Sequence, residues 1–185
     1  MPEAVFIDRD GTIVEEVGYG SSFDETSLIP GAAGAIARLN ERAIPVIVIS
    51  NQAGVARGYF PESNIPRMHE GIARALRKSS AHVDAWYWCP HLPEGQVDEY
   101  AIDCDCRKPK PGMLKKAAHD LHLDLSNCAM IGDKASDIEA GERALCRTVL
   151  VLTGHGAEEW SSWKLPMKPS HVAPDLAGAV DWLIN

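Results

Sequence analysis

The sequence predicts a three-layer α/β/α fold built around a parallel β-sheet. Apolar segments of strand length recur along the chain, and most are nearly continuous rather than alternating, which is typical of strands buried on both faces. They are separated by longer segments with helical periodicity. Strands that alternate with helices favour a parallel sheet with helices on both sides.

The elements follow in order along the chain. The first expected strand is the apolar run Ala4-Val5-Phe6-Ile7, and Ala, Ile and Leu at helical spacing predict the first helix. The expected strands are 4–8, 45–50, 83–88, 128–132 and 148–152. The expected helices are 31–43, 62–79, 111–122, 134–145 and 174–184.

Three connections interrupt this alternation. Residues 12–30 and 89–110 are longer than most connections in a compact domain, so we expect them to carry function or to cover a site. The segment 154–171 is rich in Gly, Ser, Pro and Trp and is expected to be an irregular surface loop. With 185 residues, no internal repeat and no clear boundary, residues 1–185 are expected to form a single domain.

Composition narrows the classes of partner and location. The net charge of −8 disfavours a nucleic acid as partner, because nucleic-acid-binding domains gather positive charge. The chain shows neither a membrane-length apolar run nor a signal pattern after Met1, and five cysteines suit a reducing compartment better than a disulfide framework. We therefore expect a cytoplasmic protein without membrane partners, and a monomer.

Complementary polar groups follow four of the expected strands. Asp8 and Asp10 follow the first strand, and two carboxylates so close together would repel each other without a cation or electrophile between them. Asp10-Gly11-Thr12 alone could be a simple Asp-Gly turn. The other strand ends, however, supply hydroxyl, amide, ammonium and carboxylate groups, in Ser50-Asn51-Gln52, Arg107-Lys108 and Asp133-Lys134 with Asp137. Ligands bind at the carboxyl ends of parallel strands, and this set suits phosphoryl transfer.

These motifs resemble those of the haloacid dehalogenase (HAD) superfamily of aspartate-nucleophile phosphatases. Asp8, Asp10 and Thr12 match its first motif, Asp-x-Asp-x-Thr. Ser50 matches the second motif, Lys108 the third, and Asp133 with Asp137 the acidic fourth. The resemblance implies a Rossmann-like, HAD-like domain, here without a large cap domain.

The resemblance also implies a role for each matched residue. Asp8 is the expected nucleophile, and Asp10 is expected to protonate the leaving oxygen and later to activate water. Asp8, Asp133 and the backbone carbonyl of Asp10 are the expected Mg²⁺ ligands. Donors to the phosphoryl oxygens are expected to be the side chains of Ser50, Asn51 and Lys108.

The second long connection carries a separate metal signature. Cys89-Pro90-His91 and Cys104-Asp105-Cys106 give the pattern C-x-H-x12-C-x-C, and three thiolates with one imidazole complete a tetrahedral zinc set. A closed four-ligand site predicts a structural Zn²⁺. The loop 89–106 has no hydrophobic core of its own, and the metal would take the place of one. Cys128 and Cys146 are expected to be buried core thiols.

Only some members of the superfamily carry such a zinc loop, and the resemblance to this subgroup implies a substrate. The motifs Cys-Pro-His, Cys-x-Cys-Arg-Lys-Pro, Asn-Gln-x-Gly-x-Ala-Arg-Gly and Gly-Asp-Lys resemble those of members that remove the C7 phosphate of D-glycero-D-manno-heptose 1,7-bisphosphate, giving heptose 1-phosphate for lipopolysaccharide or another surface glycan. A small sugar bisphosphate is thus the implied partner. Arg107 is expected to hold its second phosphate, and the further substrate-binding candidates are Asn51, Arg57 and Lys134.

Other functions remain open at this point. The alternative enzyme is a histidinol-phosphate phosphatase or a broader small-molecule phosphatase. The histidinol-phosphatases share the zinc ligands and the Asp-Arg-Asp-Gly-Thr start. An inactive zinc-binding module is disfavoured because Asp8 and Asp10 are both present. A DNA 3′-phosphatase is disfavoured by the acidic balance. The first long connection is expected to contact the sugar. No role is assigned to His82, His119, His122, His155 or His171.

Overall fold

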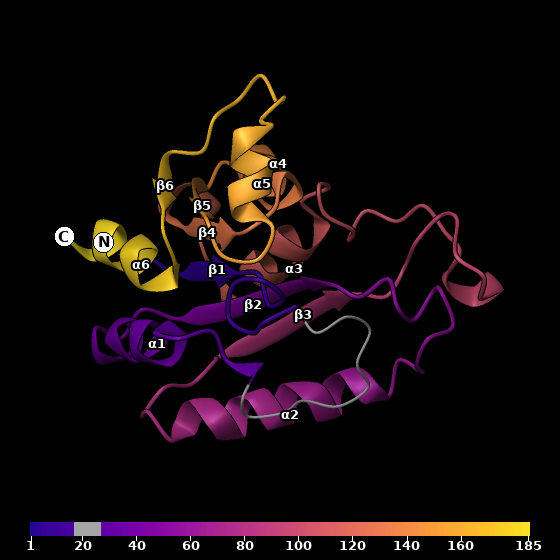
Figure 1. Cartoon of the computed structure of the whole chain (residues 1–185), viewed down its shortest axis with the longest axis horizontal. Helices are drawn as coiled ribbons and strands as arrows, with labels where there is room; N and C mark the ends of the chain where they lie inside the picture. Colours follow the sequence, from indigo (N-terminus) through magenta and orange to yellow (C-terminus); the bar gives the residue numbers. More distant parts are fainter. Residues whose placement is uncertain (17–26) are drawn as a thin grey trace.

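The computed structural model describes residues 1–16 and 27–185. Its centre is a six-stranded parallel sheet with the strand order β3-β2-β1-β4-β5-β6 (Figure 1). The strands are β1 (Val5–Ile7), β2 (Val46–Asn51), β3 (Ala85–Cys89), β4 (Ala129–Gly132), β5 (Arg147–Val151) and β6 (His171–Ala173). The first strand therefore lies in the middle of the sheet, between β2 and β4.

Helices cover both faces of this sheet. They are α1 (Ala32–Glu41), α2 (Asn64–Arg77), α3 (Gly112–Leu121), α4 (Ala135–Arg143), α5 (Gly156–Ser161) and α6 (Leu176–Ile184). Helices α1, α2 and α6 pack in the core cluster on one face, and α3 and α4 pack in the cluster on the other. In Figure 1, α1 and α2 lie below the sheet and α3 and α4 above it. The predicted α/β fold class is confirmed.

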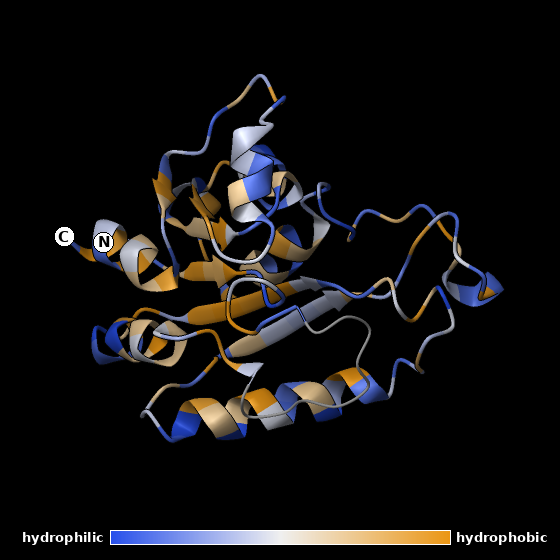
Figure 2. Ribbon diagram, in the orientation of Figure 1, coloured by the Kyte–Doolittle hydropathy of each residue, from blue (hydrophilic) through white to orange (hydrophobic). Residues whose placement is uncertain are grey.

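Alternate residues of each central strand enter opposite clusters. In β1, Val5 and Ile7 pack toward α1 and α6, whereas Phe6 packs toward α3. All three side chains are fully buried, as are the apolar residues of β2 and β4. Figure 2 shows these central strands as apolar ribbons between more polar helices. Burial on both faces explains why the strands appear in the sequence as continuous apolar runs.

Each predicted strand and helix is present, with ends that differ by at most two residues from those expected. The prediction for 154–171 is wrong. This segment contains the short helix α5, and β6 begins at its last residue, so the sheet gains a sixth strand. Glu158 and Glu159 lie in the first turn of α5, where acidic side chains are favourable. The glycine and serine content masked this helix, and β6 is too short to give a pattern.

The fold brings the carboxyl ends of β1, β2 and β4 to one edge of the sheet, beside the long connection that follows β3 (Figure 1). Residues 17–26, where the predicted sugar contact falls, lie outside the described residues. In the described part of the chain, no helix combines the length and the apolar character that a membrane span requires.

Candidate active site and zinc loop

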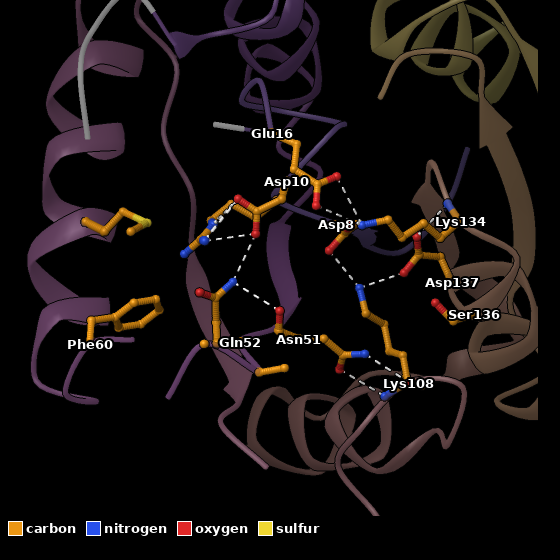
Figure 3. A pocket seen from close by; sticks show the side chains of 14 residues that line it. Asp8, Asp10, Glu16, Asn51, Gln52, Phe60, Lys108, Lys134, Ser136 and Asp137 are labelled. Carbon is orange, nitrogen blue, oxygen red and sulfur yellow. Dashed lines mark hydrogen bonds and ion pairs between the residues drawn. The ribbon is translucent and has the colours of Figure 1, made fainter. Parts of the chain in front are cut away.

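A polar cavity of about 160 Å³ lies at the carboxyl ends of β1, β2 and β4 (Figure 3). It is lined by Asp8, Arg9, Asp10, Glu16, Asn51, Gln52, Ala53, Gly54, Phe60, Met68, Lys108, Lys134, Ser136 and Asp137. These residues come from distant parts of the sequence, so the parallel sheet is what brings them together. Ser50 and Asp133 lie beside this set and are fully buried.

The centre of the cavity is a buried ion-pair network around Lys108. Its Nζ lies 2.7 Å from Asp8 Oδ1 and 2.6 Å from Asp137 Oδ1, and it also donates to the carbonyl oxygen of Ile49. Although burial alone would lower the pKa of Lys108, the charges of Asp137 and Asp8 raise it above its usual value. Lys108 is therefore a fixed, charged donor next to Asp8.

Asp137 makes one protein contact with each of its carboxylate oxygens. Its Oδ1 binds Lys108, and its Oδ2 accepts a hydrogen bond from the backbone N–H of Lys134 at the start of α4, at 3.0 Å. The sequence marked Asp137 as an acidic motif residue without giving it a task. In the structure it caps α4 with one oxygen and contacts the Lys108 ammonium with the other.

Asp133 is buried against glycine backbone. Its Oδ2 accepts from the backbone N–H of His155 at 2.9 Å, while Oδ1 has no hydrogen-bond partner among the described residues. Gly11 (φ 81°) and Gly154 (φ 53°) approach it so closely that a Cβ at either position would lie 2.2–2.3 Å from Oδ2. Glycine is required at both positions by this approach and by their left-handed backbone.

The acidic centre fits a divalent cation. One oxygen each of Asp8, Asp133 and Asp137 lie within 4.8 Å of one another, and Lys108 is the ammonium that contacts two of these three residues. Burial raises the pKa of Asp8 to about 6, although the charge of Lys108 opposes this shift. Burial, and after it the negative charge of Asp8, raises the pKa of Asp133 to about 8. The unpartnered Asp133 Oδ1 and these hard oxygen ligands suit Mg²⁺.

Asp10 is held on the opposite side of the cavity from Asp137 (Figure 3). Arg9 donates to both of its carboxylate oxygens, and Gln52 Nε2 donates to Oδ2 at 3.0 Å. Gln52 Nε2 also donates to Ser50 Oγ at 2.7 Å, so one amide connects the second strand end with the first. The carboxylate of Asp10 is thus separate from the acidic cluster; its backbone carbonyl was the predicted Mg²⁺ ligand.

Asn51 fixes the backbone of Lys108. Its Nδ2 donates to the Lys108 carbonyl oxygen at 3.0 Å, and its Oδ1 accepts from the Lys108 N–H at 3.1 Å. The side chain lines the cavity and at the same time connects β2 to the end of the zinc loop. This double contact places the Lys108 ammonium beside Asp8.

Lys134 lies at the rim of the cavity beside an acidic partner that the sequence did not reveal. Its Nζ is 3.3 Å from Glu16 Oε2, and the same oxygen is 2.6 Å from His155 Nε2. Burial would lower the pKa of Lys134, but the charges of Asp133, Asp8 and Glu16 raise it. A phosphate arriving at this rim would therefore meet a charged ammonium.

The two predicted arginines are not among the described residues that line the cavity. Arg107 donates from Nη1 to the carbonyl oxygen of His91 at 3.2 Å. Arg57 is partly buried in the loop after β2, whose residue Ala56 accepts backbone hydrogen bonds from Gln96 and Val97. Both arginines thus border the connection that carries the zinc signature.

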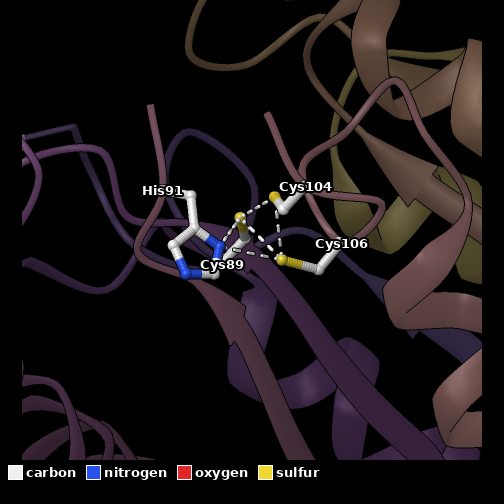
Figure 4. Close-up of side chains that lie close together, drawn as sticks. All are labelled: Cys89, His91, Cys104 and Cys106. Carbon is white, nitrogen blue, oxygen red and sulfur yellow. Dashed lines mark hydrogen bonds between the residues drawn. The ribbon is translucent and has the colours of Figure 1, made fainter. Parts of the chain in front are cut away.

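The four predicted zinc ligands come together (Figure 4). The Sγ atoms of Cys89, Cys104 and Cys106 are 3.0–3.4 Å apart, and His91 Nδ1 lies 3.4 Å from Cys106 Sγ. The pKa of the Cys106 thiol is lowered to about 5, and the largest cause is its hydrogen bond with Cys89. Three sulfurs and one imidazole nitrogen within 4.8 Å of one another fit a tetrahedral Zn²⁺. Cys128 and Cys146 are buried core residues, as predicted.

The zinc loop is tied to the walls of the cavity. Tyr100 donates to Glu62 Oε2 at 3.0 Å, and Trp88 Nε1 donates to Glu62 Oε1 at 2.8 Å. Both aromatic side chains pack against a small apolar cluster that includes Phe60, which lines the cavity. These bonds connect Tyr100 of the zinc loop, through Glu62, to the apolar cluster beside the cavity.

The sequence analysis assigned no role to Arg9, Glu16, Gln52 or His69. Arg9 stands inside the first motif, and Gln52 was noted beside Ser50, so their positions were visible but their contacts were not. Glu16 gave no signal. His69 lies on the buried side of α2 beside Met68, where a histidine is easily taken as a packing residue.

Comparisons with known proteins agree with this geometry. Residues 105–179 match the HAD-hydrolase-like family model. A D-glycero-D-manno-heptose-1,7-bisphosphate 7-phosphatase from Thermosynechococcus vestitus is 43% identical over 189 residues, covering 99% of this chain and 96% of the relative. The Escherichia coli K12 D-glycero-beta-D-manno-heptose-1,7-bisphosphate 7-phosphatase is 38% identical, covering 98% and 88%.

A solved structure gives the same result. The D,D-heptose 1,7-bisphosphate phosphatase of B. bronchiseptica, complexed with magnesium and phosphate, superposes with a TM-score of 0.86 at 32% identity over 98% of each chain. The full-length similarity supports the same assignment as the four motifs, the buried Asp8–Lys108 pair and the cysteine and histidine cluster. This chain belongs to the HAD superfamily and, within it, to the family of D-glycero-D-manno-heptose 1,7-bisphosphate 7-phosphatases.

Proposed function

We propose that this chain is a Mg²⁺-dependent phosphatase that removes the C7 phosphate of D-glycero-D-manno-heptose 1,7-bisphosphate by way of an aspartyl phosphate on Asp8. The observation that carries the proposal is the buried contact of 2.7 Å between Asp8 and Lys108 at the carboxyl end of β1. The relatives' names support the substrate.

The first step makes one bond and breaks another. A carboxylate oxygen of Asp8 forms a bond to phosphorus while the bond between phosphorus and the sugar C7 oxygen breaks, and the proton of Asp10 moves to that oxygen. Lys108 stabilises charge on the transferring group, with donors from Ser50 and Asn51 as further candidates. Bound Mg²⁺, held by Asp8, Asp133 and the Asp10 carbonyl, would supply the positive charge that lets two anions approach.

The second step releases phosphate and restores the enzyme. Asp10, now a carboxylate, takes a proton from a water molecule, whose oxygen attacks phosphorus and frees the Asp8 carboxylate. Asp10 is therefore an acid in one step and a base in the next. Its position opposite Lys108 across the cavity supports both roles (Figure 3).

The substrate's other groups have candidate partners at the rim. Lys134 is a charged donor on the cavity wall, Arg107 follows the zinc loop and donates to the His91 carbonyl oxygen, and Arg57 lies in the connection after β2. We assign the second phosphate to Arg107, with Arg57 as a further candidate for this phosphate or for the sugar, and Lys134 as another substrate-binding residue. A structural Zn²⁺ on Cys89, His91, Cys104 and Cys106 would keep Arg107 and Lys108 in place. The enzyme is proposed to act as a cytoplasmic monomer.

The deciding experiment compares two substrates with and without Mg²⁺. Phosphate release is measured from D-glycero-D-manno-heptose 1,7-bisphosphate and from histidinol phosphate under the same conditions. A Mg²⁺-dependent preference for the bisphosphate is expected. Preference for histidinol phosphate would keep the chemistry and overturn the substrate, whereas silence on both would overturn the proposed activity.

A further inference from the structure

Arg9 lies between Asp8 and Asp10 in the sequence, but its guanidinium contacts only the Asp10 carboxylate. Its Nε lies 3.1 Å from Asp10 Oδ1, and its Nη2 lies 3.0 Å from Oδ1 and 2.8 Å from Oδ2. The Arg9 side chain is 4% exposed, although arginine is seldom so buried, and that of Asp10 is 27% exposed. A planar guanidinium in this position fixes the plane of the carboxylate.

The far side of the guanidinium rests on a buried histidine. Arg9 Nη1 lies 3.4 Å from His69 Nε2. Arginine has donors but no acceptor, so this contact is favourable only when Nε2 carries no proton. Burial, and after it the charge of Arg9, lowers the pKa of His69 to about 3, which is consistent with a neutral ring that accepts from the arginine.

Aromatic side chains of the edge strand hold this histidine in place. The His69 ring stacks on Trp86, with centroids 4.4 Å apart and an interplanar angle of 21°, and meets Trp88 edge-on at 5.6 Å. Trp86 and Trp88 belong to β3, whose register with β2 pairs Trp88 with Ser50. The position of His69 is thereby fixed by the sheet itself.

The guanidinium is occupied by protein contacts on all three nitrogens, two facing Asp10 and one facing His69. Arg9 lines the cavity, but these contacts direct it to Asp10 rather than to a ligand. Gln52 adds a further donor to Asp10 Oδ2. Arg9 and Gln52 together therefore restrain the Asp10 carboxylate in one orientation.

We propose that Arg9, supported by His69, is a positioning residue that aims the Asp10 carboxyl group for proton transfer to the leaving oxygen. The inference rests on the proposed function, because it needs Asp10 to act as the acid. It extends the site from the four motifs to a stack of side chains that runs from Asp10 through Arg9 and His69 to Trp86.

A residue that positions a general acid has a specific kinetic signature. Protonation is needed most when the leaving oxygen is strongly basic, as in a sugar alcohol, and least when it is weakly basic, as in p-nitrophenol. Misplacing Asp10 should therefore slow transfer from a sugar phosphate much more than transfer from p-nitrophenyl phosphate. A residue with a merely structural role would slow both reactions to a similar degree.

The experiment measures the first turnover by rapid quench, which isolates formation of the aspartyl phosphate from its hydrolysis. In Arg9→Met the rate with heptose 1,7-bisphosphate is expected to fall at least about tenfold more than the rate with p-nitrophenyl phosphate. Arg9→Lys keeps the positive charge but lacks the planar guanidinium, so its first-turnover rate with the bisphosphate should lie between those of Arg9→Met and the unchanged protein. Equal losses on both esters would overturn the inference.

Asp10→Asn separates this inference from the proposed function. If Asp10→Asn shows the expected dependence on the leaving group and Arg9→Met does not, the arginine assignment is wrong while the role of Asp10 stands. If Asp10→Asn shows none, the acid role fails and the inference with it. In the Asp10→Asn background, Arg9→Met should cause no further selective loss.

A matched pair at His69 tests the support beneath Arg9 even if Arg9→Met does not fold. His69→Phe keeps an aromatic ring against Trp86 and removes the acceptor, whereas His69→Gln keeps an acceptor within reach of Arg9. We expect His69→Phe to lose rate selectively with the sugar phosphate, by about threefold, and His69→Gln to lose less. The same loss in both, without dependence on the leaving group, would remove His69 from the positioning stack.

Discussion

Lys108 and Asp8 form a buried ion pair at the carboxyl edge of the sheet, with 2.7 Å between Nζ and Oδ1 and side chains only 2% and 8% exposed. The proposed nucleophile is therefore held by the cation that would later stabilise the transferred phosphoryl group. Because Asp137 binds the same ammonium, removal of different members of this network should affect stability and activity differently.

Asp8→Asn should abolish turnover and leave the fold intact. The neutral amide cannot attack phosphorus, and its introduction removes one of three carboxylates crowded into a buried cluster. Steady-state phosphate release is expected to fall more than about 10³-fold, with a thermal midpoint close to that of the unchanged protein. Residual turnover well above background in both Asp8→Asn and Asp8→Ala would exclude Asp8 as the nucleophile.

Lys108→Met should be inactive and also unstable. It removes the shared partner of Asp8 and Asp137 from the interior, and breaking a buried pair by deleting one member costs about 3–5 kcal/mol. Chemical denaturation would measure the loss. Lys110→Met is the control, because Lys110 pairs at the surface with Asp103 and should change stability little. Similar stabilities for the two variants would contradict the importance of the buried network.

Zinc should be bound in a 1:1 ratio and should stabilise the connection after β3. Metal analysis of the purified protein is expected to find Zn²⁺, and Cys104→Ser should lose it and lower the thermal midpoint by about 10 °C or more. Cys146→Ala is the matched control, since this thiol is also buried but is not one of the four clustered ligands. Full thermal stability in zinc-free protein would refute a structural role for the metal.

Arg107→Ala should discriminate between substrates with one and two phosphates. Loss of a charge-assisted contact to the second phosphate is expected to lower kcat/KM for the bisphosphate about 10- to 100-fold, and that for a sugar monophosphate about twofold or less. Arg107 also donates to the His91 carbonyl, so zinc content is measured in the same variant. Equal losses on both substrates with zinc retained would mean that Arg107 does not hold the second phosphate.

The order of strands and helices could be predicted because the central elements carry strong local patterns. Val5, Phe6 and Ile7 are apolar on both faces, and only a strand buried on both sides places them well. The cluster of three cysteines and one histidine could be predicted for a similar reason, since Cys89 with His91 and Cys104 with Cys106 form two tight pairs in the sequence. Short elements such as β6 lack such a signal, because three residues cannot establish a period.

The contacts among site residues could not be predicted because they depend on tertiary placement. Nothing in the local sequence indicates that Asp137 caps α4 with one oxygen and binds Lys108 with the other. Likewise, Arg9 and His69 are 60 positions apart and meet only because α2 lies against β3. The motifs indicated which side chains gather at the cavity, whereas the fold determines how each side chain is held.

His69 should make the protein lose more stability in acid than a variant that lacks this imidazole. Its pKa is lowered to about 3 in the folded state, chiefly by burial, against 6.5 in the unfolded chain. Between these values the unfolded state binds more protons, so the contribution of His69 is complete above pH 6.5 and is lost as the pH falls below it. The lost stability approaches about 1.4 kcal/mol per pH unit well inside this window.

Urea unfolding of the unchanged protein and of His69→Phe from pH 7.5 to pH 4.5 measures this effect. Phenylalanine retains a ring against Trp86 and has no titratable group, so the free energies of unfolding of the two proteins should differ most at pH 7.5 and converge or cross toward pH 4.5. His82→Phe is the control, because this histidine is largely exposed. A constant difference between the unchanged protein and His69→Phe across the range would mean that His69 titrates normally, and that Arg9 rests on a ring that can carry its own charge.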